Sequence, residues 1–252
     1  MKSNLDILAG DLVIKGRKDS IITKYENNDI YIKIKDNANI FIPKTKKNIH
    51  IEALENTKSD IFMTSNMNTY VDIFGGASIT FKIVELEKSE AIFKCNLNEA
   101  LANVEINTLV ITSQNVIMHQ EVYHKAINTT SLISNYGVAA NYGQISFDTT
   151  GKIYNKMSNS NCRQLSKGFI LGDEAKITSK PILLIDEYDV KAYHGAAIGK
   201  MNEDDLFYLM SRGLTRNEAY SLVLDGILQQ YLSSIEDEGI KNALEEKIHN
   251  IL

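Results

Sequence analysis

Short runs rich in Val, Ile, Tyr and Thr recur roughly every 8–12 residues from about residue 10 to residue 190. The run Ile30–Ile34 alternates apolar and polar side chains, and Asn, Asp, Ser or Gly separate it from the runs around it. Such runs are typical of strands joined by tight turns. The expected strand centres lie near residues 31, 41, 51, 71, 82, 92, 106, 117, 132, 146, 153, 170, 183 and 190. This spacing fits a sandwich, a barrel or a β-solenoid and does not choose among them.

The pattern becomes helical after Gly199. Asn202 is a predicted N-cap with an acid in the first turn, and Gly213 is a predicted helix stop. Thr215 and Glu218 form a capping box, which opens a second helix. Its predicted apolar stripe consists of Ala219, Leu222, Val223, Gly226, Ile227 and Tyr231. A third helix, capped by Ser234, has Ile240, Leu244, Ile248 and Ile251 along one side. We therefore expect a β body over 1–199 and a helical C-terminal domain over 200–252.

Composition excludes several classes of function. The 252-residue chain has a net charge of −5, which gives no support to nucleic-acid binding. Its two cysteines, Cys95 and Cys162, exclude a disulfide-dense scaffold and a self-contained four-cysteine site, and we predict that both are packing thiols. No segment approaches the ~20 apolar residues of a membrane span, and the N-terminus does not resemble a signal peptide, so we expect a cytoplasmic protein without a membrane partner.

Common catalytic and ligand-binding patterns are not found. Gly75, Gly76 and Gly137 lack the spacing of a phosphate-binding loop, so we expect no nucleotide on this chain. His119 and His124 are five residues apart, which in a strand places them on opposite faces and makes them a poor metal pair. A carbohydrate-active solenoid would need clustered aromatic residues or paired acids along one face, and this alternative ranks last.

Two stretches carry more information. The first, Val190–Gly199, contains small residues around His194, whose imidazole is either an exposed ligand or a buried, hydrogen-bonded side chain. The second is a segment that either closes the β core or offers a face to a partner. It consists of Leu206, Phe207, Tyr208, Leu209, Met210, Ser211, Arg212 and Gly213.

Together these stretches resemble the SufB/SufD family of iron–sulfur cluster assembly proteins. The family signature of a His-Gly-Ala segment, an acidic connector and Phe-Tyr-Leu-x-Ser-Arg-Gly matches residues 194–213. Upstream, His124–Ser131 resembles the family's His-x-x-x-Asn-Thr-x-Ser segment, and Pro181–Ile185 resembles its Pro-x-Leu-x-Ile strand. The match covers roughly residues 100 to 235, with several motifs in the family's order.

The resemblance implies a right-handed parallel β-helix (solenoid) followed by a C-terminal α-helical domain. It also implies a SufC-like ABC ATPase docked on the residues at 206–213, and pairing as a homodimer or a heterodimer with a SufB-like subunit. Of two family cysteines, one would fall near Ser166 and the other at Ala192, and neither is present, while His194 is retained, which makes the chain more SufD-like at that site. In such a solenoid, Ile would stack inside successive coils and Asn would form ladders at the turns.

Two functions follow from the resemblance, and neither is enzymatic. In the first, the chain is a scaffold subunit that helps to hold a transient iron–sulfur cluster, with His194 as its ligand. In the second, it is a structural adaptor that binds no metal and only positions the ATPase.

Overall fold

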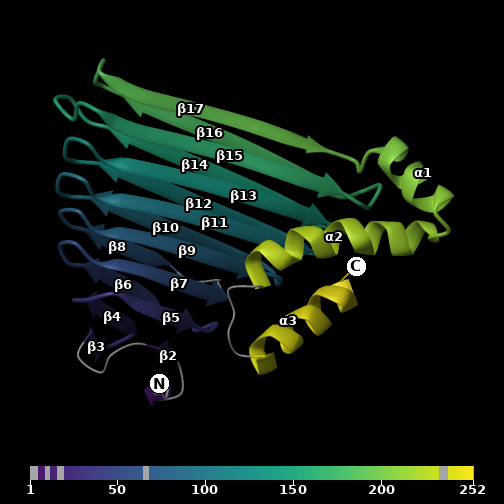
Figure 1. Cartoon of the computed structure of the whole chain (residues 1–252), viewed down its shortest axis with the longest axis horizontal. Helices are drawn as coiled ribbons and strands as arrows, with labels where there is room; N and C mark the ends of the chain where they lie inside the picture. Colours follow the sequence, from purple (N-terminus) through teal and green to yellow (C-terminus); the bar gives the residue numbers. More distant parts are fainter. Residues whose placement is uncertain (1–4, 9–11, 16–19, 65–67, 233–237, 252) are drawn as a thin grey trace.

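The computed structural model describes residues 5–8, 12–15, 20–64, 68–232 and 238–251. Within these residues the chain forms two sheets, and from β4 onward successive strands alternate strictly between them. Nearly all neighbouring strands are parallel, while β1–β2, β2–β5 and β3–β4 at the N-terminal end are antiparallel. Each coil thus contributes one strand to each sheet, so the predicted β-helix is confirmed (Figure 1).

The strands lengthen along the solenoid. The nine-stranded sheet, counted over the described residues, comprises β1 (Leu5–Leu8), β2 (Leu12–Lys15), β5 (Ala38–Ile42), β7 (Lys58–Thr64), β9 (Ser78–Glu85), β11 (Asn103–Thr112), β13 (Thr130–Ala139), β15 (Ser160–Ile170) and β17 (Val190–Gly199). The eight-stranded sheet, counted in the same way, comprises β16 (Lys176–Ile185), β14 (Gln144–Ile153), β12 (Asn115–His124), β10 (Ser89–Leu97), β8 (Thr69–Ile73), β6 (Asn48–Ala53), β4 (Asp29–Ile34) and β3 (Ile21–Glu26). The strand pattern missed β1, β2, β3 and β7, and it split β14 into two centres at 146 and 153.

The unbroken strand β14 has a packing cause. A Cβ atom at Gly151 would lie 2.3 Å from the Cys162 sulfur, so this glycine makes room for a thiol in the next coil. Gly151 is therefore an interior strand residue next to a larger side chain.

Isoleucine fills the interior of the first coils, as predicted. Ile30, Ile32, Ile34, Ile49 and Ile51 alternate along β4 and β6 and are at most 2% exposed. Asparagine serves the turns through its backbone conformation. Five asparagines have positive φ angles, a conformation that Asn tolerates better than most residues. These are Asn27, Asn56, Asn128, Asn141 and Asn159.

Three helices follow the last strand: α1 (Glu203–Ser211), α2 (Arg216–Leu232) and α3 (Glu238–Ile251). The predicted caps are confirmed: the Asn202 side chain accepts the Asp204 N–H, and the Thr215 N–H donates to Glu218 Oε2 at 2.7 Å. Gly213, just beyond α1, has φ +99°. Ser234 and the side chain of Ile240 lie outside what the structure describes.

The helices pack on the outer face of the nine-stranded sheet, where α2 crosses the strands (Figure 1). The predicted stripe on α2 is partly wrong, because Leu222 is 52% exposed and Gly226 is exposed. Leu224 and Leu228 are buried instead, against a core that includes Leu109, Ile111 and Val138. Helical spacing fits both stripes, and contact with the sheet selects between them. None of the described helices is long and apolar enough to cross a membrane.

Candidate functional site

The last coil leaves one end of the solenoid open. Within the described residues, β16 pairs only with β14 and β17 pairs only with β15, so each has one free edge. Apolar side chains are exposed around this end: Ile182 (48%), Leu184 (47%), Tyr193 (50%) and Tyr188, which is fully exposed. A free strand edge beside exposed apolar side chains is a favourable place for another chain to bind.

His194 lies at this open end. Its register partner in β15 is Gln164, an interior residue only 2% exposed, and register partners in a parallel pair point to the same face. His194 therefore faces the interior side of the last coil, where no further coil of the described chain covers it, and it is exposed. The sequence allowed either an exposed or a buried imidazole at this position, and in the structure the imidazole is exposed.

The two thiols are sealed inside the solenoid. Cys95 and Cys162 both have 0% exposure, and burial raises the pKa of each thiol. The prediction that both are packing thiols is confirmed by this burial. Cys162 lies directly beneath Ala192 in the β15–β17 register, and Ser166, on the same interior face, is 5% exposed. Among the described residues, the open end therefore has no accessible thiolate.

The segment His124–Ser131 is a buried hydrogen-bond network. His124 Nδ1 lies 2.8 Å from Thr129 Oγ1, and Nε2 lies 2.8 Å from Ser131 Oγ. Thr129 in turn donates to the Ala126 carbonyl at 3.1 Å. Burial lowers the pKa of His124 to about 4, so the imidazole is neutral at pH 7. This motif holds the turn between two coils, and its imidazole is sealed from solvent.

His119 lies on the opposite face of β12, as predicted. Its ring nitrogens are 3.5 Å from Glu90 Oε1 and 3.6 Å from Asp148 Oδ2 on neighbouring strands. Over the described residues, no group of three or more His, Cys, Asp or Glu side chains is arranged to hold a metal ion.

The first helix presents both of its aromatic side chains to solvent. Phe207 is 73% exposed, Tyr208 is 56% exposed and Met210 is 40% exposed, while Leu206 is fully buried. One side of α1 contacts the rest of the chain through Leu206, and the other side leaves Phe207 and Met210 in solvent. Arg212 covers the Tyr208 ring, with its guanidinium carbon 5.2 Å from the ring centroid. Apart from the buried Leu206, the segment 206–213 forms an exposed surface, the α1 surface, which has the composition of a protein interface.

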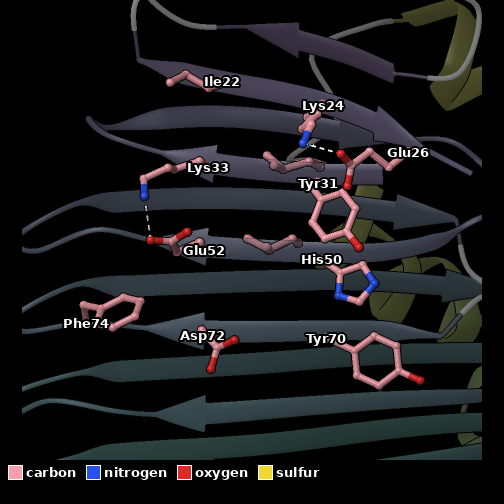
Figure 2. Close-up of a pocket in the computed structure, with 12 residues that line it drawn as sticks. Ile22, Lys24, Glu26, Tyr31, Lys33, His50, Glu52, Tyr70, Asp72 and Phe74 are labelled. Atoms are coloured by element: carbon pink, nitrogen blue, oxygen red, sulfur yellow. Dashed lines mark hydrogen bonds and ion pairs between the residues drawn. The ribbon is translucent and has the colours of Figure 1, made fainter. Parts of the chain in front are cut away.

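An open groove of about 670 Å³ lies on the outer face of the eight-stranded sheet, near the N-terminal coils (Figure 2). Tyr31, His50 and Tyr70 form a column along one wall, with ring centroids 4.6 and 5.1 Å apart. On the other wall, Lys33 and Glu52 form an ion pair at 2.7 Å. The His50 ring is thus stacked between the two tyrosine rings, and the three rings form one aromatic column along the groove.

The interior of the later coils holds polar residues that the strand pattern did not identify. Gln120, Asn135 and Gln164 are at most 3% exposed and face inward. Each occupies a position in its strand where the alternation of apolar and polar residues calls for an apolar side chain. This exception to the pattern could have identified them from the sequence.

Comparison with known proteins is consistent with this architecture. The family model for the SUF system FeS cluster assembly SufBD core domain matches residues 21–227. The iron–sulfur cluster assembly protein SufD of Bacillus subtilis (strain 168) is 36% identical over 124 residues, which are 49% of this chain and 28% of that protein. SufD of Escherichia coli (strain K12) is 25% identical over 165 residues, covering 60% of this chain and 36% of the relative.

A SufBD family protein of Archaeoglobus fulgidus is 40% identical over 86 residues, which are 34% of this chain and 22% of that relative. In each comparison the match covers much less than two thirds of the relative. The family model, in contrast, matches most of this chain, from β3 through α1 and the greater part of α2. The chain therefore belongs to the SufBD family of the SUF iron–sulfur cluster assembly system.

Proposed function

We propose that this chain is a scaffold subunit of a SUF-type iron–sulfur cluster assembly complex. In this role it docks a SufC-like ABC ATPase on the α1 surface and pairs at the open end with a second copy or with a SufB-like subunit. The observation that carries the proposal is the open end, where His194 and two free strand edges are exposed beside apolar side chains. The family membership supports it.

The cluster is the cargo of this scaffold, and His194 is its ligand on this chain. A neutral imidazole can coordinate iron, and His ligation raises the potential of a cluster relative to thiolate ligation. The remaining ligands come from the partner subunit or from small molecules, because both thiols of this chain are buried. Pairing at the open end would place those ligands beside His194.

Anaerobic reconstitution with iron and sulfide tests the metal role. We expect visible absorption that His194→Ala weakens, whereas the matched variant His119→Ala, on the outer face of β12, leaves it unchanged. The experiment uses the chain alone and the chain mixed with a SufB-like subunit. Equal absorption for wild type and His194→Ala in both samples would remove His194 from the site.

Copurification tests the docking role. Phe207→Ala and Arg212→Ala remove the most exposed ring of the α1 surface and the cation that covers Tyr208. We expect each to abolish copurification with the ATPase. Ile127→Ala, at an exposed turn between β12 and β13, is the control and should leave copurification intact. Retention of the ATPase by both α1 variants would contradict the proposed docking surface.

A second candidate is an adaptor that positions the ATPase without holding metal. It is favoured by the burial of both cysteines and by Ser166 and Ala192 at the positions of family cysteines. It predicts that the α1 variants lose the ATPase while no iron binds, with or without a partner subunit.

A further inference from the structure

The turn between β16 and β17, at the open end, presents a tyrosine entirely to solvent. Tyr188 is fully exposed, whereas the next most exposed tyrosine of the described residues, Tyr142, is 69% exposed. Leaving a whole aromatic ring in water is unfavourable, and Tyr is among the residues that most often anchor protein interfaces. Tyr188 is therefore a candidate anchor for a chain that binds at the open end.

The turn holds Tyr188 on a hydrogen-bonded frame. Glu187 Oε1 accepts the Tyr188 N–H at 2.8 Å, and Glu187 Oε2 accepts the Lys156 N–H at 2.8 Å. Asn155 Nδ2 donates to the Asp186 carbonyl at 3.2 Å, which ties the turn to the coil below. An anchor on a pre-organised turn loses little conformational freedom when it binds.

A pocket of about 430 Å³ lies beside Tyr188. Its apolar floor consists of Ile185, Val190 and Ala192. The register partners of these three residues in the coil below are at most 1% exposed, so the floor residues point to the interior side of the last coil. Because no further coil of the described chain covers that side, the floor is accessible to a second chain.

The pocket has the chemistry that a tyrosine side chain needs. The apolar floor can cover a ring, and Asp186 and Glu187, which also line the pocket, can accept a phenolic hydroxyl. Backbone N–H groups of the turn and of the coil below lower the pKa of Glu187, so its carboxylate is an acceptor at neutral pH. Lys152 forms an ion pair with Asp186, which offsets part of the repulsion between two such acidic turns.

The anchor and the pocket lie on the same patch of one chain. Two copies related by a two-fold axis can therefore exchange them, because residues that meet across such an axis belong to one self-complementary patch. A patch that carries both halves of a contact fits a second copy of the chain better than an unrelated partner.

We propose that Tyr188 anchors a symmetric pairing of two copies of this chain, with the ring of each copy in the Ile185–Val190–Ala192 pocket of the other. The inference rests on the proposed function for the choice of the open end, and it adds the residues that determine which chain binds there. Ala192 and His194 lie on the same face of β17, so pairing through this pocket brings the second copy beside His194.

Sedimentation equilibrium of the full chain tests the anchor. We expect a dimer whose dissociation constant rises by at least about 30-fold in Tyr188→Ala, as the loss of a buried aromatic anchor would cause. Tyr188→Phe keeps the ring and should raise the constant by less than about 10-fold. Tyr142→Ala, at the β13–β14 turn, is the matched control and should leave the dimer unchanged. That turn leads from the nine-stranded to the eight-stranded sheet, whereas the Tyr188 turn leads back, so the two lie at opposite corners of the solenoid.

Filling the pocket tests the other half of the contact. Ala192→Leu narrows the pocket and should weaken the dimer, and in that background Tyr188→Ala should add less than about 3-fold, because the ring and the pocket belong to one contact. The inference is wrong if the wild-type chain stays monomeric up to about 100 μM. It is also wrong if Tyr188→Ala leaves the dimer unchanged, or if the effects of the two substitutions add in full.

These outcomes are separate from those that test the proposed function. A monomeric chain that still binds the ATPase and acquires iron together with a SufB-like subunit would overturn the pairing of two copies and leave the scaffold role intact. An intact dimer without His194-dependent absorption would overturn the metal role alone.

Discussion

Glu85 is a buried acid whose ionisation should weaken the fold at neutral and alkaline pH. It ends β9, is 2% exposed, and accepts the N–H groups of Leu86 and Glu87 through Oε1, each at 3.0 Å. Its second oxygen, Oε2, has no partner among the described residues. Burial raises the pKa of Glu85 to about 7, although the Glu87 N–H, the Ser89 hydroxyl and Lys44 act in the opposite direction.

The size of the effect follows from the two pKa values. With an ordinary value of 4.5 in the unfolded chain and about 7 in the folded protein, the folded state holds its proton more tightly. Below pH 4.5 the carboxyl is protonated in both states and does not lower the free energy of unfolding. As the pH rises through 7, its ionisation lowers the free energy of unfolding. The shift corresponds to roughly 3 kcal/mol at pH 8.5, at about 1.4 kcal/mol per pKa unit.

Glu85→Gln should remove this cost, because the amide oxygen still accepts the two backbone N–H groups and the side chain no longer ionises. We expect the free energy of unfolding in urea to rise by about 3 kcal/mol at pH 8.5 and by less than about 0.5 kcal/mol at pH 4. Glu87→Gln is the matched control: Lys44 lowers the pKa of Glu87, so its neutralisation should not stabilise the fold at pH 8.5. An equal gain for Glu85→Gln at both pH values, or no gain at pH 8.5, would refute the argument.

Three further predictions concern single positions. Leu101 has φ +65°, a strained backbone conformation for leucine, and is 65% exposed. Leu101→Asn should therefore stabilise the chain by about 1 kcal/mol and raise its melting temperature. An unchanged or lower melting temperature would contradict backbone strain at this position. A thiol reagent should label neither Cys95 nor Cys162 in the native chain and both in urea, and rapid native labelling of either would show that the interior opens. Gly151→Ala should lower the free energy of unfolding by about 1–3 kcal/mol, because its Cβ atom would meet the Cys162 sulfur at 2.3 Å; Gly199→Ala, with open space around it, is the control.

Features that depend on neighbouring residues could be predicted from the amino-acid order. The alternation of Ile30–Ile34 identified a strand with one buried face, and Asn202, Gly213 and Thr215 identified helix ends. Alternation and capping act over two to four residues, so they need no knowledge of the fold. The spacing of the strands did not distinguish a solenoid from a sandwich or a barrel. The family resemblance over residues 194–213 predicted the solenoid.

Register and packing determine the rest. The three polar side chains of His124, Thr129 and Ser131 suggest chemistry in the sequence, but the stacking of two coils buries them as a hydrogen-bonded set. Leu222 fits the helical period as well as Leu224 does, and only contact with the sheet buries one and exposes the other. The burial of Asn135, the sealing of Cys162 beneath Ala192 and the exposure of His194 likewise depend on which residues lie opposite in the next coil. These partners are about 30 residues apart in the chain. Local order thus determined the strands and helix ends of this protein, whereas the pairing of distant segments decided which side chains reach solvent, because burial is set by neighbours from other coils.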